Sequence, residues 1–138
     1  MNKHTGQCLC GKIKYEVKQI GSKIGHCHCT MCRKFHGAAF STFAEAKMSD
    51  FHWLQGDIFL HTYTADNGTK RKFCQNCGSS LIFESASESH DVIEFSLATL
   101  DQPPMLTPDA HIYLSTKVSW LELSDDLPKY LNGREESV

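Results

Sequence analysis

The sequence lacks the features that would assign it to a membrane, to the cell exterior or to a nucleic acid. No run approaches the roughly 20 apolar residues that a membrane-spanning helix needs. The segment Met1–Gln7 has no apolar core of the kind found in signal peptides, so we expect a cytoplasmic protein. Fourteen Lys and Arg against sixteen Asp and Glu give a net charge of -2, whereas nucleic-acid-binding domains are usually strongly basic. We therefore expect no membrane and no nucleic-acid partner.

Internal repeats and low-complexity tracts are also missing. A chain of 138 residues fits one domain, because domains cluster near 100–150 residues. A hydrophobic content of 41% suits an ordinary globular core. We predict a single domain over residues 1–131, followed by a polar C-terminal tail over residues 132–138.

The apolar pattern is typical of short β-strands. Ile13, Tyr15 and Val17 alternate with polar residues, as in a half-buried strand over Lys12–Val17. Further short apolar segments are separated by turn signals and predict a mainly β domain, whereas the basic run Lys70–Lys72 is interpreted as a solvated turn. The other expected strands are Ala39–Phe43, Phe51–Leu54, Ile58–Thr64, Ser80–Glu84, Val92–Leu97 and His111–Leu114.

Cysteine is the residue that the sequence has in excess. An odd number of cysteines cannot all form intramolecular disulfides, and four of the six gaps between neighbours are i+2 or i+3. Such close pairs rarely bridge each other without strain, but they can converge on one metal ion. The seven are Cys8, Cys10, Cys27, Cys29, Cys32, Cys74 and Cys77.

Two of the cysteine pairs are far from the others in sequence. Phe73–Gly78 contains C-x-x-C and is typical of a zinc knuckle, with Gly78 supplying a positive φ as the chain leaves the turn. Cys8 and Cys10 are expected on a strand, where residues i and i+2 share a face and both thiols can reach one ion.

The central cluster combines C-x-C with C-x-x-C over Cys27–Cys32. Thr30 is a plausible N-cap and Gly37 a plausible stop for a short helix over Met31–His36. Cys32 would lie in the first turn of that helix, where we expect the helix N-terminus to lower the pKa of its thiol.

Seven thiols divide naturally into four and three. A structural zinc ion has four protein ligands, whereas a catalytic one has three and keeps a position for water or substrate. We therefore predict two Zn²⁺ ions per chain, one in a closed and one in an open site. The closed site is assigned to Cys8, Cys10, Cys74 and Cys77, and the open site to Cys27, Cys29 and Cys32.

Two alternatives for the central cluster stay open. His36 lies one helical turn beyond Cys32 and could close the site, whereas His26 and His28 point away from the cysteines if that segment is a strand. A histidine beside a metal cluster more often supports the ligands than acts as a catalyst. The three thiols could also be redox-active without a metal.

Three motifs resemble the glutathione-dependent formaldehyde-activating family, which includes the centromere protein V group. They are G-x-C-x-C-G at Gly6–Gly11, C-H-C-x-x-C-R at Cys27–Arg33 and F-C-x-x-C-G at Phe73–Gly78. The similarity extends over about Thr5–Tyr130. It implies a mainly β fold of zinc-pinned antiparallel sheets with one short helix. It also implies a structural zinc on the first and last cysteine pairs and a zinc regarded as catalytic on the central three.

The resemblance also implies an activity. The family is named for the condensation of formaldehyde with glutathione, classed as a carbon–sulfur lyase reaction in the reverse sense. We expect such an enzyme, with glutathione or another small thiol and an aldehyde as its small-molecule partners. Arg33 is the candidate contact for the anionic thiol, and a structural hydrogen bond is its alternative role. The alternative function is a non-catalytic zinc-binding module that binds a thiol or a protein partner.

Overall fold

Short strands dominate the computed structural model, which describes residues 3–86 and 91–134. The strands form two sheets, and α1 (Thr30–His36) is the one α-helix in this part of the chain, so the predicted mainly β fold is confirmed. The described residues separate into unit 1, with residues 3–21, 44–86 and 91–105, and unit 2, with residues 22–43 and 106–134. The single domain over residues 1–131 stays a prediction, and residues 135–138 of the predicted tail lie outside the described residues.

Unit 1 contains a three-stranded antiparallel sheet in the order β1-β2-β5. Its strands are β1 (His4–Gln7), β2 (Lys14–Val17) and β5 (Phe51–Gln55). The predicted alternation is confirmed, because Ile13, Tyr15 and Val17 are all buried. The Tyr15 ring stacks on Phe51 with ring centroids 4.9 Å apart. This sheet therefore contributes one face of the apolar core of the unit.

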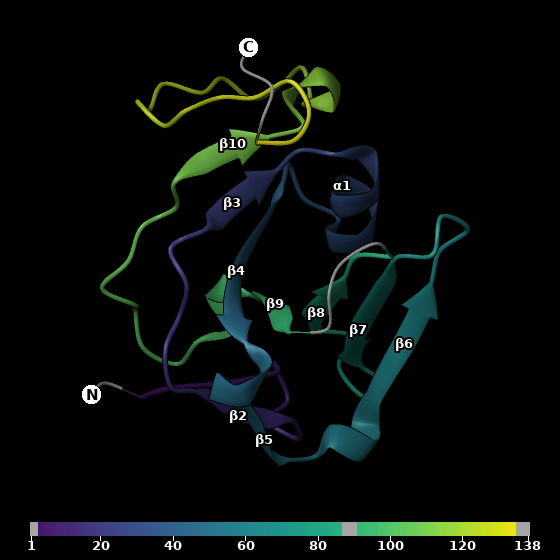
Figure 1. Ribbon diagram of the computed structural model, residues 1–138. Coiled ribbons are helices and arrows are strands. Elements are labelled where there is room, and N and C mark those ends of the chain that lie inside the picture. Colours follow the sequence, from purple (N-terminus) through teal and green to yellow (C-terminus); the bar gives the residue numbers. More distant parts are fainter. Residues whose placement is uncertain (1–2, 87–90, 135–138) are drawn as a thin grey trace. The chain divides into compact units, whose positions relative to one another are not determined.

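The second set of strands in unit 1 is an antiparallel meander. The strands β6 (Leu60–Thr64), β7 (Lys70–Cys74), β8 (Ser80–Glu84) and β9 (Val92–Ser96) pair in chain order, and β6, β7 and β8 lie side by side in Figure 1. β4 (Ser41–Lys47) is the neighbour of β9 in the sheet order. The meander ends in the turn between β7 and β8, which carries the last two cysteines.

The interpretation of Lys70–Lys72 as a solvated turn is wrong. Arg71 is buried in β7, with its guanidinium carbon 4.9 Å from the centroid of the Phe83 ring. Lys72 forms an ion pair with Glu84 on the neighbouring strand. The cation–π contact of Arg71 and the ion pair of Lys72 thus allow this basic segment to form an inner strand of the sheet.

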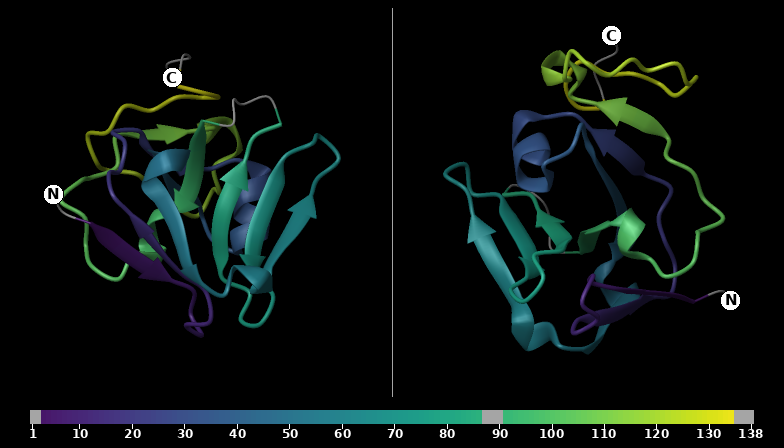
Figure 2. Two further views of the ribbon diagram at one scale, coloured as in Figure 1. Left: turned by 60° about the horizontal axis from the view of Figure 1, so that its bottom comes forward. Right: turned by 180° about the vertical axis from the view of Figure 1, so that it is seen from behind.

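Unit 2 is built around a parallel strand pair and the short helix. β3 (Ile24–Cys27) pairs with β10 (Ala110–Ile112), which places His111 beside His26 and Ile112 beside Cys27. Figure 1 and, from two further directions, Figure 2 show β3, β10 and α1.

Several predicted boundaries shift. β1 and β3 were not predicted, β4 begins at Ser41 rather than Ala39, and β10 ends at Ile112 rather than Leu114. The last change follows from Tyr113, whose φ of 58° leaves the strand conformation before the 3-10 turn Leu114–Thr116. Tyr113 also donates its backbone N–H to the carbonyl of Asn132, so the start of the predicted tail is attached to unit 2.

Among residues 3–86 and 91–134, none of the helices has the length and apolarity required to cross a bilayer. The cytoplasmic location stays a prediction.

Gly56 provides a test of the packing in unit 1. Its φ is +75°, and a Cβ added there would lie 1.8 Å from the carbonyl oxygen of Lys12. We expect Gly56→Ala to lower the free energy of unfolding by more than about 3 kcal/mol, because backbone strain and a backbone clash add. Gly37→Ala is the control, since the φ of Gly37 is also positive but a Cβ added there would meet no non-neighbouring atom within 4 Å. This variant should lower the free energy of unfolding, measured in urea, by only about 1–2 kcal/mol. Equal midpoints for the two variants would contradict this account of Gly56.

Candidate metal centres

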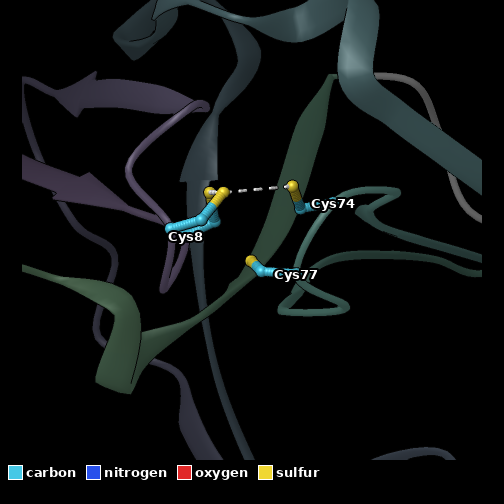
Figure 3. A group of neighbouring side chains, drawn as sticks. Cys8, Cys74 and Cys77 are labelled. Atoms are coloured by element: carbon cyan, nitrogen blue, oxygen red, sulfur yellow. Dashed lines mark hydrogen bonds between the residues drawn. The ribbon is translucent and has the colours of Figure 1, made fainter.

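The first candidate centre lies within unit 1 and consists of four thiols. The Sγ atoms of this four-cysteine cluster all lie within 4.8 Å of one another; its members are Cys8, Cys10, Cys74 and Cys77. Figure 3 shows Cys8 facing Cys74 and Cys77 from the segment after β1. The structure thus brings together the four residues that the sequence assigned to the closed site.

Two similar turns present these thiols. The Gly11 N–H donates to the Cys8 carbonyl at 3.1 Å, and the Gly78 N–H donates to the Cys74 carbonyl at 2.7 Å. Gly11 and Gly78 have φ values of +81° and +83°, so the prediction for Gly78 is confirmed. The strand predicted through Cys8 and Cys10 is wrong, because β1 ends at Gln7 and the chain turns there.

The spacing of the sulfur atoms fits a tetrahedral zinc ion. Sulfurs bound at about 2.3 Å in a tetrahedron are separated by about 3.8 Å. The Cys8–Cys10 and Cys10–Cys74 sulfur pairs are 3.6 Å and 3.9 Å apart. Cys8 and Cys74 are buried, Cys77 is half-buried and Cys10 is exposed, so the cluster lies partly at the surface but offers the four protein ligands of a structural site.

Polar groups around the four-cysteine cluster favour thiolates at some positions. The Asn76 side chain and the backbone near Lys12 lower the pKa of Cys10. Burial opposes ionisation of Cys77, but the Ser79 hydroxyl and nearby backbone groups outweigh it and lower the pKa to about 6. Burial raises the pKa of Cys74 to about 11, so full ionisation of the cluster calls for a bound cation.

The second candidate centre lies within unit 2 and is the three-cysteine cluster of Cys27, Cys29 and Cys32. Cys27 ends β3, Cys29 is the N-cap of α1 and Cys32 lies in the first turn. Their Sγ atoms lie within 4.8 Å of one another, and none of the histidines in the described residues belongs to the group. The cluster therefore offers three protein ligands and fits the open type of zinc site.

Cys29 has a second role in this cluster. Its sulfur accepts a hydrogen bond from the Cys32 backbone N–H at 3.3 Å, so Cys29, and not Thr30 as predicted, is the helix N-cap. The helix ends at Gly37 in the left-handed conformation, as predicted.

Two thiols of the three-cysteine cluster, those of Cys27 and Cys32, have raised pKa values in the absence of a metal. Contacts with the Cys29 and Cys32 thiols, together with burial, raise the pKa of Cys27. The hydrogen bond with Cys27 lowers the pKa of Cys32, but Cys29 and burial outweigh it and the net shift is upward. The prediction that the helix N-terminus makes Cys32 ionise easily is therefore wrong for the metal-free thiol, because burial among other thiols outweighs the helix dipole.

The nearby histidines make other contacts. His26 Nδ1 lies 2.8 Å from the Thr42 hydroxyl, and the His36 ring packs against the Phe43 ring. His28 Nε2 lies 2.8 Å from His111 Nδ1, and burial lowers the pKa of His28 to about 4. Sequence reasoning missed the contact with His111, because 83 residues separate the two histidines.

Arg33 lies immediately after the last cysteine of this cluster. Its Nε atom is buried and makes no hydrogen bond, and its guanidinium forms no ion pair among residues 3–86 and 91–134. The structural hydrogen bond considered for Arg33 is therefore absent from the described residues. A guanidinium without an ion pair, on the residue that follows Cys32, is suited to bind an anionic group.

The two clusters predict different effects of cysteine loss. Cys77→Ser should remove about one bound zinc and lower the melting temperature strongly or prevent folding, because metal binding at a closed site contributes to folding. Cys29→Ser should also lose about one zinc but stay folded, since the trio closes only a local loop and serine is a good N-cap. Zinc content by mass spectrometry and thermal unfolding measure both effects. An unchanged melting temperature for Cys77→Ser would refute the four-ligand site.

Comparisons with known proteins agree with this arrangement. The family model described as glutathione-dependent formaldehyde-activating enzyme matches residues 3–116. An uncharacterized lyase of Schizosaccharomyces pombe is 28% identical over 83 residues, which are 60% of this chain and 58% of that protein. The match therefore spans less than two thirds of that relative.

A solved structure has the same fold. The crystal structure of a Rhodobacter sphaeroides protein is similar with a TM-score of 0.61 and 24% sequence identity, and the match covers 73% of this chain and 91% of that one. The family model, for its part, covers most of this chain, including both cysteine clusters. On that match, the chain belongs to the glutathione-dependent formaldehyde-activating family.

Proposed function

We propose that this chain is a zinc-dependent carbon–sulfur lyase that acts on the adduct of an aldehyde with glutathione or another small thiol. The observation that carries the proposal is the three-cysteine cluster, to which the described residues add no fourth protein ligand. Arg33, which follows Cys32 in the sequence and has a buried Nε without a hydrogen bond, is the candidate contact for the anionic part of the thiol. Membership of the family and the lyase name of the S. pombe relative support the class of reaction.

The reaction is an addition and its reverse. In the direction of synthesis the thiol adds across the aldehyde carbonyl: a carbon–sulfur bond forms, and the proton of the thiol passes to the carbonyl oxygen. The lyase direction breaks the same bond and returns the thiol and the aldehyde. A zinc ion held by three thiolates would supply a position that keeps an incoming thiol deprotonated and nucleophilic.

Residues of α1 would fix the position of the thiol substrate. Cys32 and Arg33 are consecutive in this helix, and the Arg33 backbone N–H donates to the Cys29 carbonyl at 3.0 Å. The backbone of Arg33 thus belongs to the same helix turn as Cys29 and Cys32. The planar set of N–H donors on its guanidinium suits a carboxylate of a glutathione-like substrate.

The four-cysteine cluster has a different role in this proposal. Its ligands come from two turns of unit 1, and the Leu9 N–H also donates to the Ser79 hydroxyl at 2.8 Å, which joins the same two turns. We assign it a structural zinc that holds the turn after β1 to the turn after β7. Two Zn²⁺ ions per chain follow from the two roles.

Thiol binding tests the open position. In protein with cobalt in place of zinc at Cys27, Cys29 and Cys32, glutathione should change the metal absorption spectrum in a saturable way and release a proton. Arg33→Ala should weaken this binding about tenfold or more, because a charge-assisted contact contributes about 1.5–3 kcal/mol. Lys34→Ala, an exposed neighbour on the same helix, is the control and should bind as the wild type does.

The choice of thiol separates the roles of metal and arginine. Mercaptoethanol has no carboxylate, so its binding should be the same in wild type and in Arg33→Ala. A cobalt spectrum that is indifferent to every thiol tried would refute the open position and favour the non-catalytic zinc-binding module.

Turnover is the second test. The zinc-loaded wild type should form and cleave the thiol–formaldehyde adduct faster than the uncatalysed reaction does, measured by NMR exchange of the adduct protons. Cys29→Ser should lose this acceleration while it stays folded. Equal rates with and without wild-type protein would refute the lyase proposal even if thiols bind.

A further inference from the structure

Three side chains of unit 2 are linked by hydrogen bonds, starting from His28, which lies between two cysteines of the three-cysteine cluster. His28 Nε2 is 2.8 Å from His111 Nδ1, and His111 Nε2 is 2.9 Å from Asp125 Oδ2. His28 and His111 are 0% and 1% exposed, whereas the Asp125 side chain is 44% exposed. The linked side chains thus run from the surface to a fully buried ring, and Asp125 lies beyond the residues that the family model matches.

The direction of the hydrogen bonds follows from Asp125. Its other oxygen, Oδ1, accepts from the Leu127 N–H at 3.1 Å and from Lys129 Nζ at 3.2 Å, so the carboxylate acts as an acceptor. His111 then donates through Nε2, and a neutral His111 accepts from His28 Nε2–H at its Nδ1. A His111 protonated at both nitrogens would force the proton of His28 onto Nδ1, which is buried and makes no hydrogen bond. His28 is thereby the Nε2–H tautomer, with a lone pair at Nδ1.

The opposite direction is disfavoured by two contacts. It would set the lone pair of His111 Nε2 against the Asp125 carboxylate. It would also place an N–H at His28 Nδ1, which is buried and makes no hydrogen bond. A buried N–H without an acceptor loses the hydrogen bond that it makes with water in the unfolded chain, so this arrangement is unfavourable. One tautomer of His28 is therefore strongly selected.

The backbone of His28 is held by the same part of the chain. Its N–H donates to the Ile112 carbonyl at 3.0 Å, and its carbonyl accepts from the Thr116 hydroxyl at 3.0 Å. His28 is the residue between Cys27 and Cys29. Residues 111–116 thus hold the ligand loop at both backbone groups and, through His111, at the side chain.

We propose that His111 and Asp125 are positioning residues for the three-cysteine cluster: they fix His28 as the Nε2–H tautomer and so fix the loop that presents Cys27 and Cys29 to a metal. This inference rests on the proposed metal-binding role of that cluster. Supporting residues of this kind typically change metal affinity by 10–100-fold when they are replaced.

Two replacements of His111 separate the hydrogen bond from the packing. Asparagine places an amide oxygen near the position of Nδ1 and can still accept from His28, but it cannot reach Asp125. Glutamine places its amide near the position of Nε2 and can still meet Asp125, but it leaves His28 Nε2–H without its acceptor. Both remove the buried ring, so a merely structural role predicts similar effects for the two.

Metal affinity is the first readout. Cobalt is titrated into the full chain in competition with a chelator, and the absorption of the three-cysteine cluster is followed. His111→Gln should weaken this cobalt site by about 10–100-fold and alter its spectrum, whereas His111→Asn should stay near the wild type. Equal affinities and spectra for the two variants would overturn the proposal. A wild-type cluster that takes up no cobalt would instead overturn the proposed function.

The tautomer of His28 is the second readout and needs no variant that must fold. Long-range ¹⁵N–¹H correlation spectra of the zinc-loaded wild type distinguish a protonated Nε2 from a protonated Nδ1. His28 should be the Nε2–H form, and Asp125→Asn should add the Nδ1–H form, because an amide can donate to His111 and permit the reverse direction. A wild-type His28 that is protonated at Nδ1 would overturn the proposal.

Discussion

The structure of unit 1 depends on the convergence of four thiols on one point. Cys10 and Cys74 are 64 residues apart in the sequence, yet their sulfurs lie 3.9 Å apart. The four sulfurs can lie this close only if the turn after β1 and the turn after β7 each have a fixed shape. The positive φ values of Gly11 and Gly78 permit these two turns. Because a small unit buries a limited core, a metal that joins two distant turns contributes a large share of its stability.

The three-cysteine cluster obeys a different constraint. Its ligands come from one short stretch of chain, so a metal there closes only a small loop and contributes little to the fold. The shape of the stretch is set instead by the strand pairing of Cys27 with Ile112 and by the hydrogen bonds of His28 to residues 111–116. Because contacts with residues 111–116 set the shape of this loop, a fourth coordination position at a bound metal could stay open for a substrate without loss of the fold.

The features predictable from the sequence are those that act over short distances. Cysteine spacing predicted both clusters, and the glycines after Cys77 and after His36 have the backbone conformations expected of them. Apolar alternation predicted Tyr15 and Val17 as buried. Each of these depends on neighbours only a few residues away.

The features that were missed depend on tertiary contacts. β7 was not predicted, because Arg71 is buried against the Phe83 ring and hydrophobic periodicity counts an arginine as exposed. The helix cap was misplaced because a cysteine sulfur replaces the usual hydroxyl of Thr30. The upward shift in the pKa of Cys32 reflects burial among other thiols. The contact between His28 and His111 joins the residue after β3 to β10, which is 83 residues further along the chain.

The position of Cys29 at the start of α1 makes the helix depend on the metal. A helix of seven residues is too short to be stable alone, so its first hydrogen bond, from the Cys32 N–H to the Cys29 sulfur, matters to all of it. A metal that turns this sulfur into a thiolate makes it a stronger acceptor and strengthens the cap. Metal release would therefore weaken the helix that carries Arg33. If the proposed function holds, substrate recognition and occupancy of the metal site are thermodynamically linked through the Cys29 sulfur.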